Sequence, residues 1–354
     1  MAPDTNPERE HRVRSSTRHL SRLDLLGTAV VAATAMWALV AAANRPGEPE
    51  AYLLALLAAA GAYVAARVAA ARSALVVPAV VAGAVTGLLV LWPGALGGTA
   101  TAPPLDYGNA DGALVAQAVG AACLAGLVVA SDRRRGEILV LAGLLVLAAF
   151  ATRSVAAAVG ALVILLTALM SAAVYRKSTV VVVSAVCVTG VVLGTVVLGV
   201  LGTRSEGGLR GTAEAGLTER RVQLWTDGVR LTERFPARGT GPGTFVTNSP
   251  TASADADVRS AHSLWLRQGA EQGVPGALCM VAMVGWVYVR LWRSPQPPAV
   301  VAVGAVTFTA FVVQASMDYV AEFPVVLVAV GLLMGATTAM PTPELRARMD
   351  RGVL

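Results

Sequence analysis

Long apolar stretches are the feature that most constrains how this chain folds. They consist mainly of Ala, Val, Leu and Gly, and most are about 20 residues long, which lets an α-helix cross about 30 Å of hydrocarbon. Lipid offers the backbone no hydrogen-bond partner, so a spanning segment must pair its backbone groups within itself. The stretches therefore predict an all-α polytopic bundle of transmembrane helices.

The overall composition excludes a soluble protein. Hydrophobic residues make up 55% of the 354 residues, charged residues make up 14%, and the mean hydropathy is +0.64. A soluble domain carries roughly 25% charged residues. The three cysteines all fall in apolar stretches, where thiols behave as small apolar side chains, and they form no disulfide or metal-ligand pattern. Membrane lipid is therefore an expected partner, and nucleic acid is not.

We predict about ten transmembrane helices and one long polar loop. The helices are expected at 25–43, 51–70, 75–96, 112–130, 138–151, 155–174, 179–201, 273–292, 299–316 and 320–340. The chain then divides into a basic cytoplasmic tail (1–23), helices one to seven (24–201), the loop (202–263), helices eight to ten (264–341) and a second cytoplasmic tail (342–354).

The short basic loops fix the orientation of this bundle. With ten crossings, they all fall on the side of the Arg-rich N-terminal tail: Arg67 and Arg72, Arg133 to Arg135, Arg176 and Lys177, Arg290 and Arg293, and Arg346, Arg348 and Arg351. Basic short loops mark the cytoplasmic face. We therefore expect a multi-pass protein of the plasma (inner) membrane, with both termini cytoplasmic and the 202–263 loop extracytoplasmic.

The long loop is basic as well, although it is expected outside. Its arginines are Arg204, Arg210, Arg220, Arg221, Arg230, Arg234, Arg238 and Arg259. Long loops can escape the charge rule. Anionic lipid phosphate is the partner that this charge indicates.

The first motif of the loop is a helix that carries Arg221. Thr218 is expected to cap it, and Pro236 is expected to stop it after about Arg234. Arg221, Trp225 and Gly228 fall on one face at spacings of four and three. The amphipathic pattern places Trp225 at headgroup level, and a guanidinium fork suits phosphate oxygens. The alternative is that Arg221 pairs with Glu219 or Asp227 or extends toward water.

A glycine-rich segment follows, with Gly239, Gly241 and Gly243 alternating with Thr240 and Pro242. Such a segment forms neither a helix nor a regular strand. It could present backbone N–H groups to an anion, or it could be a tight turn that returns the chain to the membrane. It is not a nucleotide P-loop, because no Lys-Ser or Lys-Thr follows.

Three further polar positions bear on chemistry. His262 is the only histidine outside the N-terminal tail, and imidazole is the usual side chain for accepting a proton at neutral pH, although a lone histidine is more often structural. Asp318 stands at a turn on the same outer face, either solvated or as a partner for His or Arg. Asp255-Ala-Asp257 resembles a metal-binding element of nucleotide-sugar transferases, but nucleotide sugars are cytoplasmic.

The ordered motifs together resemble the O-antigen ligase/polymerase superfamily. The matching residues are Arg221, Trp225, Pro236, Gly239, Gly241, Gly243, Phe245, His262, Ser263, Leu266, Glu271, Gly273 and Gly276. Weaker similarities lie at Tyr107-Gly-Asn109, Thr152-Arg153-Ser154 and Ser316-Met-Asp318-Tyr319. The topology derived from charge places Asn109, Arg153, Arg221, His262 and Asp318 on one external face.

The resemblance implies a membrane glycosyltransferase with a bundle of the GT-C type. The donor would be a glycan on polyprenyl pyrophosphate, and the acceptor a hydroxyl of a glycan, lipid or protein. His262 would be the general base, and Arg221 and Arg153, with Arg220, would bind the pyrophosphate. Other expected substrate-binding residues are Trp225, Gly239, Gly241, Gly243, Asn109 and Asp318. The resemblance implies no metal, no cofactor and inversion at the anomeric carbon.

Some departures and alternatives bear on this interpretation. Ser263 replaces the Asn that often follows the histidine, Gln314 replaces a His, and about twelve helices are common in the family where we predict ten. A polymerase of the same superfamily would extend the glycan, whereas a ligase would move it to another acceptor. A metal-dependent transferase that uses polyprenyl monophosphate sugars, and a transporter or scaffold without enzymatic activity, are the remaining alternatives.

Overall fold

A computed structural model describes residues 7–91, 107–171, 176–204, 219–255, 258 and 260–351, with the backbone alone for 7–21, 203 and 204. Within these ranges every regular element is helical, which confirms the all-α prediction. The ten predicted apolar helices correspond to α1 (Pro7–Ala42), α2 (Pro49–Arg72), α3 (Val76–Leu91), α4 (Gly108–Val128), α5 (Asp132–Ala151), α6 (Val155–Leu169), α7 (Lys177–Arg204), α12 (Leu264–Trp292), α13 (Pro298–Met317) and α14 (Pro324–Thr337).

Six of the described helices are long and apolar enough to cross a membrane: residues Arg22–Ala42 of α1, α2, α4, Lys177–Gly202 of α7, α12 and α13. Three shorter apolar helices are α3, α6 and α14. The chain is therefore a polytopic membrane protein. The expectation that all ten helices cross the membrane stays a prediction.

Several helices begin earlier than predicted, α1 by the widest margin (residue 7 instead of 25), and the starts of α14 and α12 differ for clear local reasons. The last helix begins at Pro324 instead of residue 320, because Phe323 precedes a proline and is extended (φ −90°, ψ 107°), and Val320–Glu322 form a 3₁₀ turn, η3. Helix α12 begins at Leu264 instead of residue 273. Residue 273, where the helix was expected to begin, is instead a break within α12: Gly273 has φ 70° and ψ −172°, and Pro275 follows. Residues 92–96 and 172–174 of two predicted helices lie outside the described ranges.

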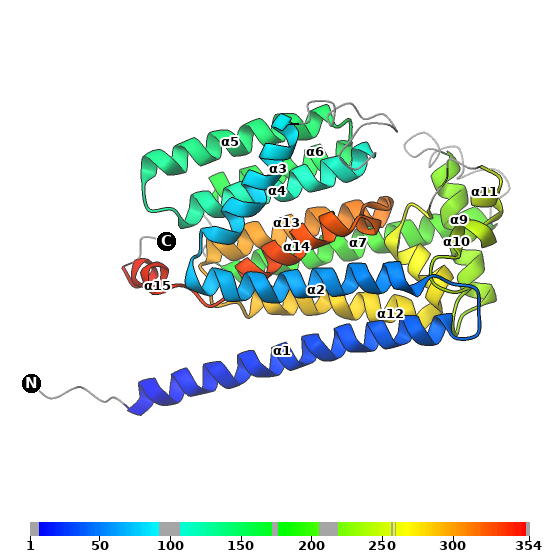
Figure 1. Cartoon of the computed structure of the whole chain (residues 1–354), viewed down its shortest axis with the longest axis horizontal. Helices are drawn as coiled ribbons and strands as arrows, with labels where there is room; N and C mark the ends of the chain where they lie inside the picture. The colour runs from blue at the N-terminus through cyan, green and yellow to red at the C-terminus, as the bar shows by residue number, and fades with distance from the viewer. Residues whose placement is uncertain are drawn as a thin grey trace, which may run out of the picture.

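Helix α4 forms the centre of the bundle. Nearly every residue from Ala110 to Leu127 is buried, because α3, α5, α6, α13 and α14 all pack against it. Helices α2, α12 and α1 lie side by side along another side of the bundle, with α1 at its edge (Figure 1). The many Ala and Gly residues of α4 let neighbouring backbones approach closely, which is how membrane helices pack without a hydrophobic driving force.

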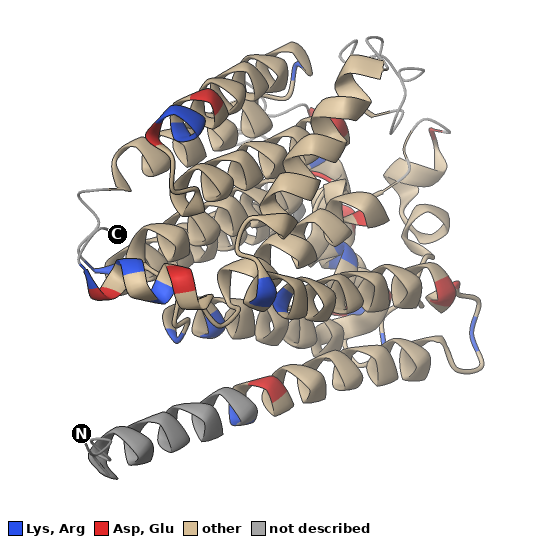
Figure 2. Ribbon diagram, turned by 60° about the vertical axis from the view of Figure 1, so that its left-hand side comes forward, with Lys and Arg blue, Asp and Glu red and all other residues tan. Residues whose placement is uncertain are grey.

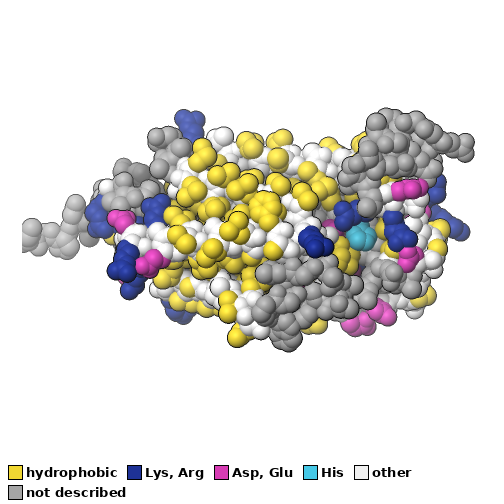
Figure 3. Space-filling model, turned by 90° about the horizontal axis from the view of Figure 1, so that it is seen from above, with side chains coloured by type: hydrophobic (Ala, Val, Ile, Leu, Met, Phe, Trp, Pro, Cys, Tyr) yellow, Lys and Arg dark blue, Asp and Glu magenta, His cyan; other side chains and the backbone are white. Residues whose placement is uncertain are grey.

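The two ends of the bundle differ in content. The start of α1 and helix α15 (Pro343–Asp350) lie at one end, whereas α9 (Glu219–Arg234), α10 (Phe245–Asn248) and α11 (Pro250–Ser253) lie at the other (Figure 1). Charged positions lie mainly near the helix ends (Figure 2). A band of hydrophobic side chains separates two charged ends on the face in Figure 3. This arrangement agrees with two termini on one side and the polar loop on the other.

Candidate active site

Asp318 is the centre of a polar cluster at the α9–α11 end of the bundle. Its carboxylate is 6% exposed and lies directly after the last residue of α13. It accepts hydrogen bonds from the Tyr107 hydroxyl (2.8 and 3.0 Å), Asn109 Nδ2 (2.6 Å), Arg221 Nη2 (2.9 Å) and the Tyr319 backbone N–H (2.7 Å). A buried carboxylate needs this many donors to offset its desolvation. Of the two alternatives for Asp318, solvation or pairing with a His or Arg, the structure shows the pairing with Arg221.

Three elements that are distant in sequence bring these donors together. Tyr107 and Asn109 belong to the start of α4, and Asn109 also donates to the Tyr107 hydroxyl (2.9 Å). Arg221 belongs to the first turn of α9. Burial and the nearby Asp318 charge raise the pKa of Tyr107, so its hydroxyl keeps the proton that it donates. The alternative pairing of Arg221 with Asp227 is wrong, because Asp227 accepts from Ser249 Oγ and the Thr251 N–H.

His262 stands beside this carboxylate in an unusual backbone conformation. Its φ is 49°, a left-handed value that is uncommon for a residue with a Cβ. Nδ1 lies 3.6 Å from Asp318 Oδ1, too far for a hydrogen bond, and is buried without a hydrogen-bond partner among the described residues. The ring meets Tyr319 edge-on at 4.8 Å and is 18% exposed. Figure 3 shows a histidine at the surface among charged side chains.

Helix α9 holds His262 through Trp225. The indole Nε1 donates to the His262 carbonyl oxygen at 3.1 Å, and Trp225 is fully buried. Gly199 of α7 and Gly228 of α9 permit this packing, since a Cβ at Gly199 would lie 3.1 Å from the Trp225 oxygen. The expectation that α9 lies along the membrane surface with Trp225 at headgroup level stays a prediction, but the Trp225 indole is fully buried and packs against protein. The end of α9 before Pro236 is confirmed, and its expected cap, Thr218, lies outside the described residues.

The two remaining predicted arginines lie at the margin of the cluster. Arg153 has φ 60°, and its exposed side chain forms no ion pair within the described ranges. Its loop is tied to the cluster because Gln314 Nε2 donates to Ser154 Oγ (3.3 Å) and to the Asn109 oxygen (3.0 Å). Arg220 forms an ion pair with Asp255. Asp257, the second carboxylate of the Asp255-Ala-Asp257 element, lies outside the described residues.

The glycine segment is a tight turn whose N–H groups are already bonded. Gly239, Gly241 and Gly243 all have positive φ, which confirms that the segment is neither helix nor strand. Their N–H groups donate to the Phe235 oxygen, the Glu271 oxygen and Glu271 Oε2, each at 2.9 or 3.0 Å. The turn therefore binds an anion that belongs to the protein itself. It does not leave these donors free for a substrate phosphate.

Four residues in or near the cluster were not among the predicted site residues. Tyr107 donates to Asp318, and Arg267 bridges Glu271 (3.0 Å) and Glu322 (2.7 Å). The Arg267 and Glu271 pair has the i,i+4 spacing of a helical ion pair, which was a usable signal. The bridge to Glu322 joins segments far apart in the sequence, and no local pattern indicates it.

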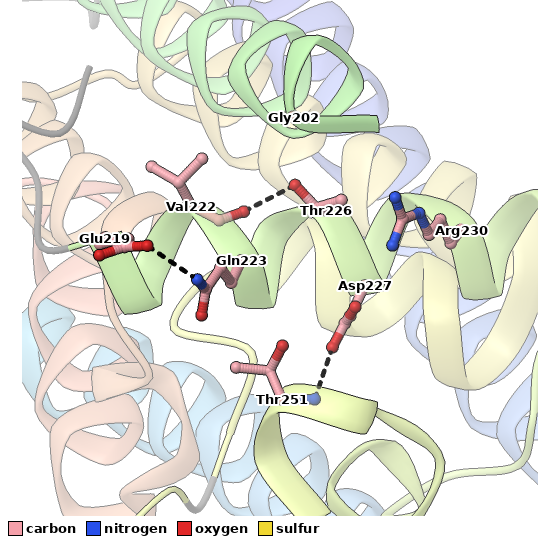
Figure 4. A pocket seen from close by; sticks show the side chains of 8 residues that line it. All are labelled: Gly202, Glu219, Val222, Gln223, Thr226, Asp227, Arg230 and Thr251. Carbon is pink, nitrogen blue, oxygen red and sulfur yellow. Dashed lines mark hydrogen bonds between the residues drawn. The ribbon is translucent and has the colours of Figure 1, made fainter. Parts of the chain in front are cut away.

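A separate small pocket lies on the other side of α9. It has a volume of about 160 Å³ and is lined by Gly202, Glu219, Val222, Gln223, Thr226, Asp227, Arg230 and Thr251. Figure 4 shows Thr226 on the side of α9 toward Gly202 and Asp227 on the side toward Thr251 of α11, whose backbone N–H donates to the Asp227 carboxylate. The pocket includes neither Arg221 nor His262. In the described part of the chain, no group of three or more His, Cys, Asp or Glu residues has the geometry to hold a metal ion.

Comparison with known proteins gives a family match for part of the chain. No curated protein matches the chain at a significant level. A protein-family model described as O-antigen ligase matches residues 119–281, a segment that runs from α4 into α12 and contains Arg153, the glycine turn and His262. Asn109 and Asp318 lie outside the matched segment, and Asp318 accepts hydrogen bonds both from Asn109 and from Arg221 within that segment. The matched segment, which is less than half of the chain, is similar to the O-antigen ligase family.

Proposed function

We propose that this protein transfers a glycan from a polyprenyl-pyrophosphate carrier to an acceptor hydroxyl at the outer face of the plasma membrane. The similarity to the O-antigen ligase family supports the coarser function, that of an O-antigen ligase- or polymerase-like membrane protein. One observation carries the finer proposal: the only described histidine at this end lies 3.6 Å from a buried carboxylate that also binds Arg221. A base, its orienting carboxylate and a phosphate-binding cation thus share one site.

His262 acts as the general base in this proposal. Nδ1 faces Asp318, so Nε2 is left to take the proton of the acceptor hydroxyl. The acceptor oxygen then bonds to the anomeric carbon, the bond from that carbon to the phosphate oxygen breaks, and the polyprenyl pyrophosphate leaves with the electron pair. Attack opposite the leaving group inverts the anomeric centre. Asp318 stabilises the imidazolium, as the carboxylate of a catalytic triad does.

Arg221 stabilises the pyrophosphate charge that develops as the bond breaks. Its side chain is 28% exposed, so it reaches the surface while one donor holds Asp318. Arg153 is a second phosphate ligand, because its exposed guanidinium forms no ion pair in the described ranges. Arg220 contributes from the neighbouring pair with Asp255. Trp225 and the three glycines position the site without touching substrate, since their polar groups are bonded to protein atoms.

The experiment is glycan transfer by the purified protein in liposomes that contain a polyprenyl-pyrophosphate-linked glycan. We expect transfer with release of polyprenyl pyrophosphate, and we expect a chelator to leave the rate unchanged. Loss of activity with chelator that added divalent ions restore would favour the metal-dependent alternative. An absence of transfer to every glycan, lipid or protein acceptor would contradict the proposal.

Ligase and polymerase activities are separated by mass spectrometry of carrier-linked glycans in a strain that lacks the protein. A ligase moves finished glycans, so its loss leaves full-length chains on the carrier. A polymerase lengthens them, so its loss leaves single units. We propose the ligase reaction and expect full-length chains, whereas single units would assign the polymerase reaction.

A further inference from the structure

A second polar cluster lies beside the Asp318 cluster, and its residues are not used in the proposed reaction. Arg267, in the first turn of α12, donates from Nε to Glu271 Oε1 at 3.0 Å. Its Nη1 lies 2.7 Å from Glu322 Oε1. The two carboxylates come from different segments, one from α12 and one from η3. One guanidinium therefore joins two parts of the chain that are far apart in the sequence.

Glu322 connects this cluster to the segments that carry His262 and Asp318. Glu322 accepts a hydrogen bond from the hydroxyl of Ser260, which lies two residues before His262. Glu322 itself lies four residues after Asp318, within the turn that follows α13. Arg267 thus holds the segment that carries the base and the segment that carries its carboxylate against the same helix.

The Glu271 side leads to the glycine turn. Glu271 Oε2 accepts from the Gly243 N–H at 3.0 Å, and Oε1 accepts from the Phe245 N–H at 3.1 Å. The Pro242 oxygen in this turn accepts from the Glu48 N–H of the α1–α2 loop at 2.8 Å. The polar network is therefore continuous from that loop, through Arg267, to the His262 and Asp318 segments.

We infer that Arg267 is a positioning residue that keeps His262 in reach of Asp318, an inference that rests on the proposed function. The pair is not held by a hydrogen bond between its members, and the left-handed backbone of His262 persists only if the surroundings enforce it. A planar guanidinium presents donors in two fixed directions and matches two carboxylates. A lysine ammonium keeps the charge but cannot reproduce this geometry.

The first test separates positioning from general stability through steady-state kinetics. We expect Arg267→Lys to accumulate in the membrane like wild type, with an unchanged KM for the carrier-linked donor and a kcat lowered by about 10- to 100-fold, because small misplacements of reacting groups cost rates of this order. We expect Arg267→Ala to lose more activity and to regain part of it with millimolar guanidinium, but not with urea. Arg230→Ala is the matched control: Arg230 is exposed on α9, and its variant should keep wild-type kinetics.

The second test needs no glycan transfer. Diethyl pyrocarbonate modifies accessible neutral imidazoles, and mass spectrometry assigns the label to the His262 peptide. Because Nδ1 of His262 is buried in the intact site, we expect faster labelling in Arg267→Lys and Arg267→Ala and an unchanged rate in Arg230→Ala. Wild-type kcat and labelling in Arg267→Lys would overturn the positioning role while leaving the proposed function intact. Loss of folded protein in both Arg267 variants without a fall in kcat per folded molecule would also overturn it.

Discussion

Nδ1 of His262 lies 3.6 Å from Oδ1 of Asp318, across a gap between two loops that lie far apart in the sequence. The carboxylate is held by four donors from three elements, so its position is fixed before any substrate binds. The histidine is held through its backbone instead, by the Trp225 indole. A fixed carboxylate and a ring free of hydrogen bonds at Nδ1 suit a base that gains and loses a proton.

Arg221→Lys tests whether phosphate recognition needs the guanidinium fork. Lysine keeps the charge but loses the planar geometry, and it cannot both hold Asp318 and bind a second oxyanion in the same way. We expect Arg221→Lys to lose nearly as much transfer activity as Arg221→Ala, measured as kcat/KM for the carrier-linked donor. Near wild-type activity in the Lys variant would show that only screened charge attraction is needed.

Gly239→Ala tests the structural role of the glycine turn. A Cβ at this position would lie 2.2 Å from the Glu271 carbonyl carbon, and the φ of 62° disfavours a side chain. Overpacking alone costs about 1–3 kcal/mol, so we expect a clear loss of thermal stability in detergent. Gly285→Ala is the control, because no atom lies within 4 Å of its added Cβ and alanine favours the helix. Equal melting temperatures for the two variants would contradict the packing described here.

Glu322 gives the protein a predictable pH dependence. Burial raises the pKa of this carboxyl above its ordinary value of 4.5, while Arg267 and Ser260 act in the opposite direction. A raised folded-state pKa means that the folded protein binds the proton more tightly, so stability from this group is gained as pH falls through that raised value. We expect the stability of wild type relative to Glu322→Gln to increase on acidification and to level off below about pH 4.5. A difference independent of pH would contradict this environment for Glu322.

Cysteine labelling tests the predicted orientation of the bundle. In a background without Cys123, Cys187 and Cys279, we expect Ser253→Cys to react with an impermeant reagent in intact cells, because Ser253 is exposed on α11. Ala347→Cys in α15, at the opposite end of the bundle, should react only after permeabilisation. The reverse labelling pattern would place the site in the cytoplasm. It would then contradict the proposal that the site uses a carrier-linked glycan at the outer face of the membrane.

The apolar helices could be predicted from sequence because each is a local pattern. The end of α9 was also predictable, since Pro236 cannot continue a helix. The late start of α14 was missed although Pro324 indicated it, because Val320, Ala321 and Phe323 extend the apolar pattern into the preceding 3₁₀ turn.

The chemistry of the site was only partly predictable. Arg221 and His262 could be singled out because they are polar residues that belong to the ordered motifs of the long loop. The contact of Tyr107 with Asp318 could not be derived, because it depends on how α4 packs against α13. The left-handed backbone of His262 was equally hidden, since positive φ is uncommon for any residue other than glycine, even though histidine adopts it more often than most. The Glu271 carboxylate, which occupies the glycine turn, is likewise a product of tertiary packing.

The most direct test of the account is the rate of glycan transfer by His262→Ala in liposomes, at matched amounts of folded protein. No other described histidine lies at this end of the bundle, so no other imidazole is placed to replace it. A general base contributes about 10²- to 10⁴-fold, so we expect the transfer rate to fall by at least about 100-fold while the KM for the donor changes little. A wild-type transfer rate in His262→Ala would contradict the central claim that His262 accepts the acceptor's proton.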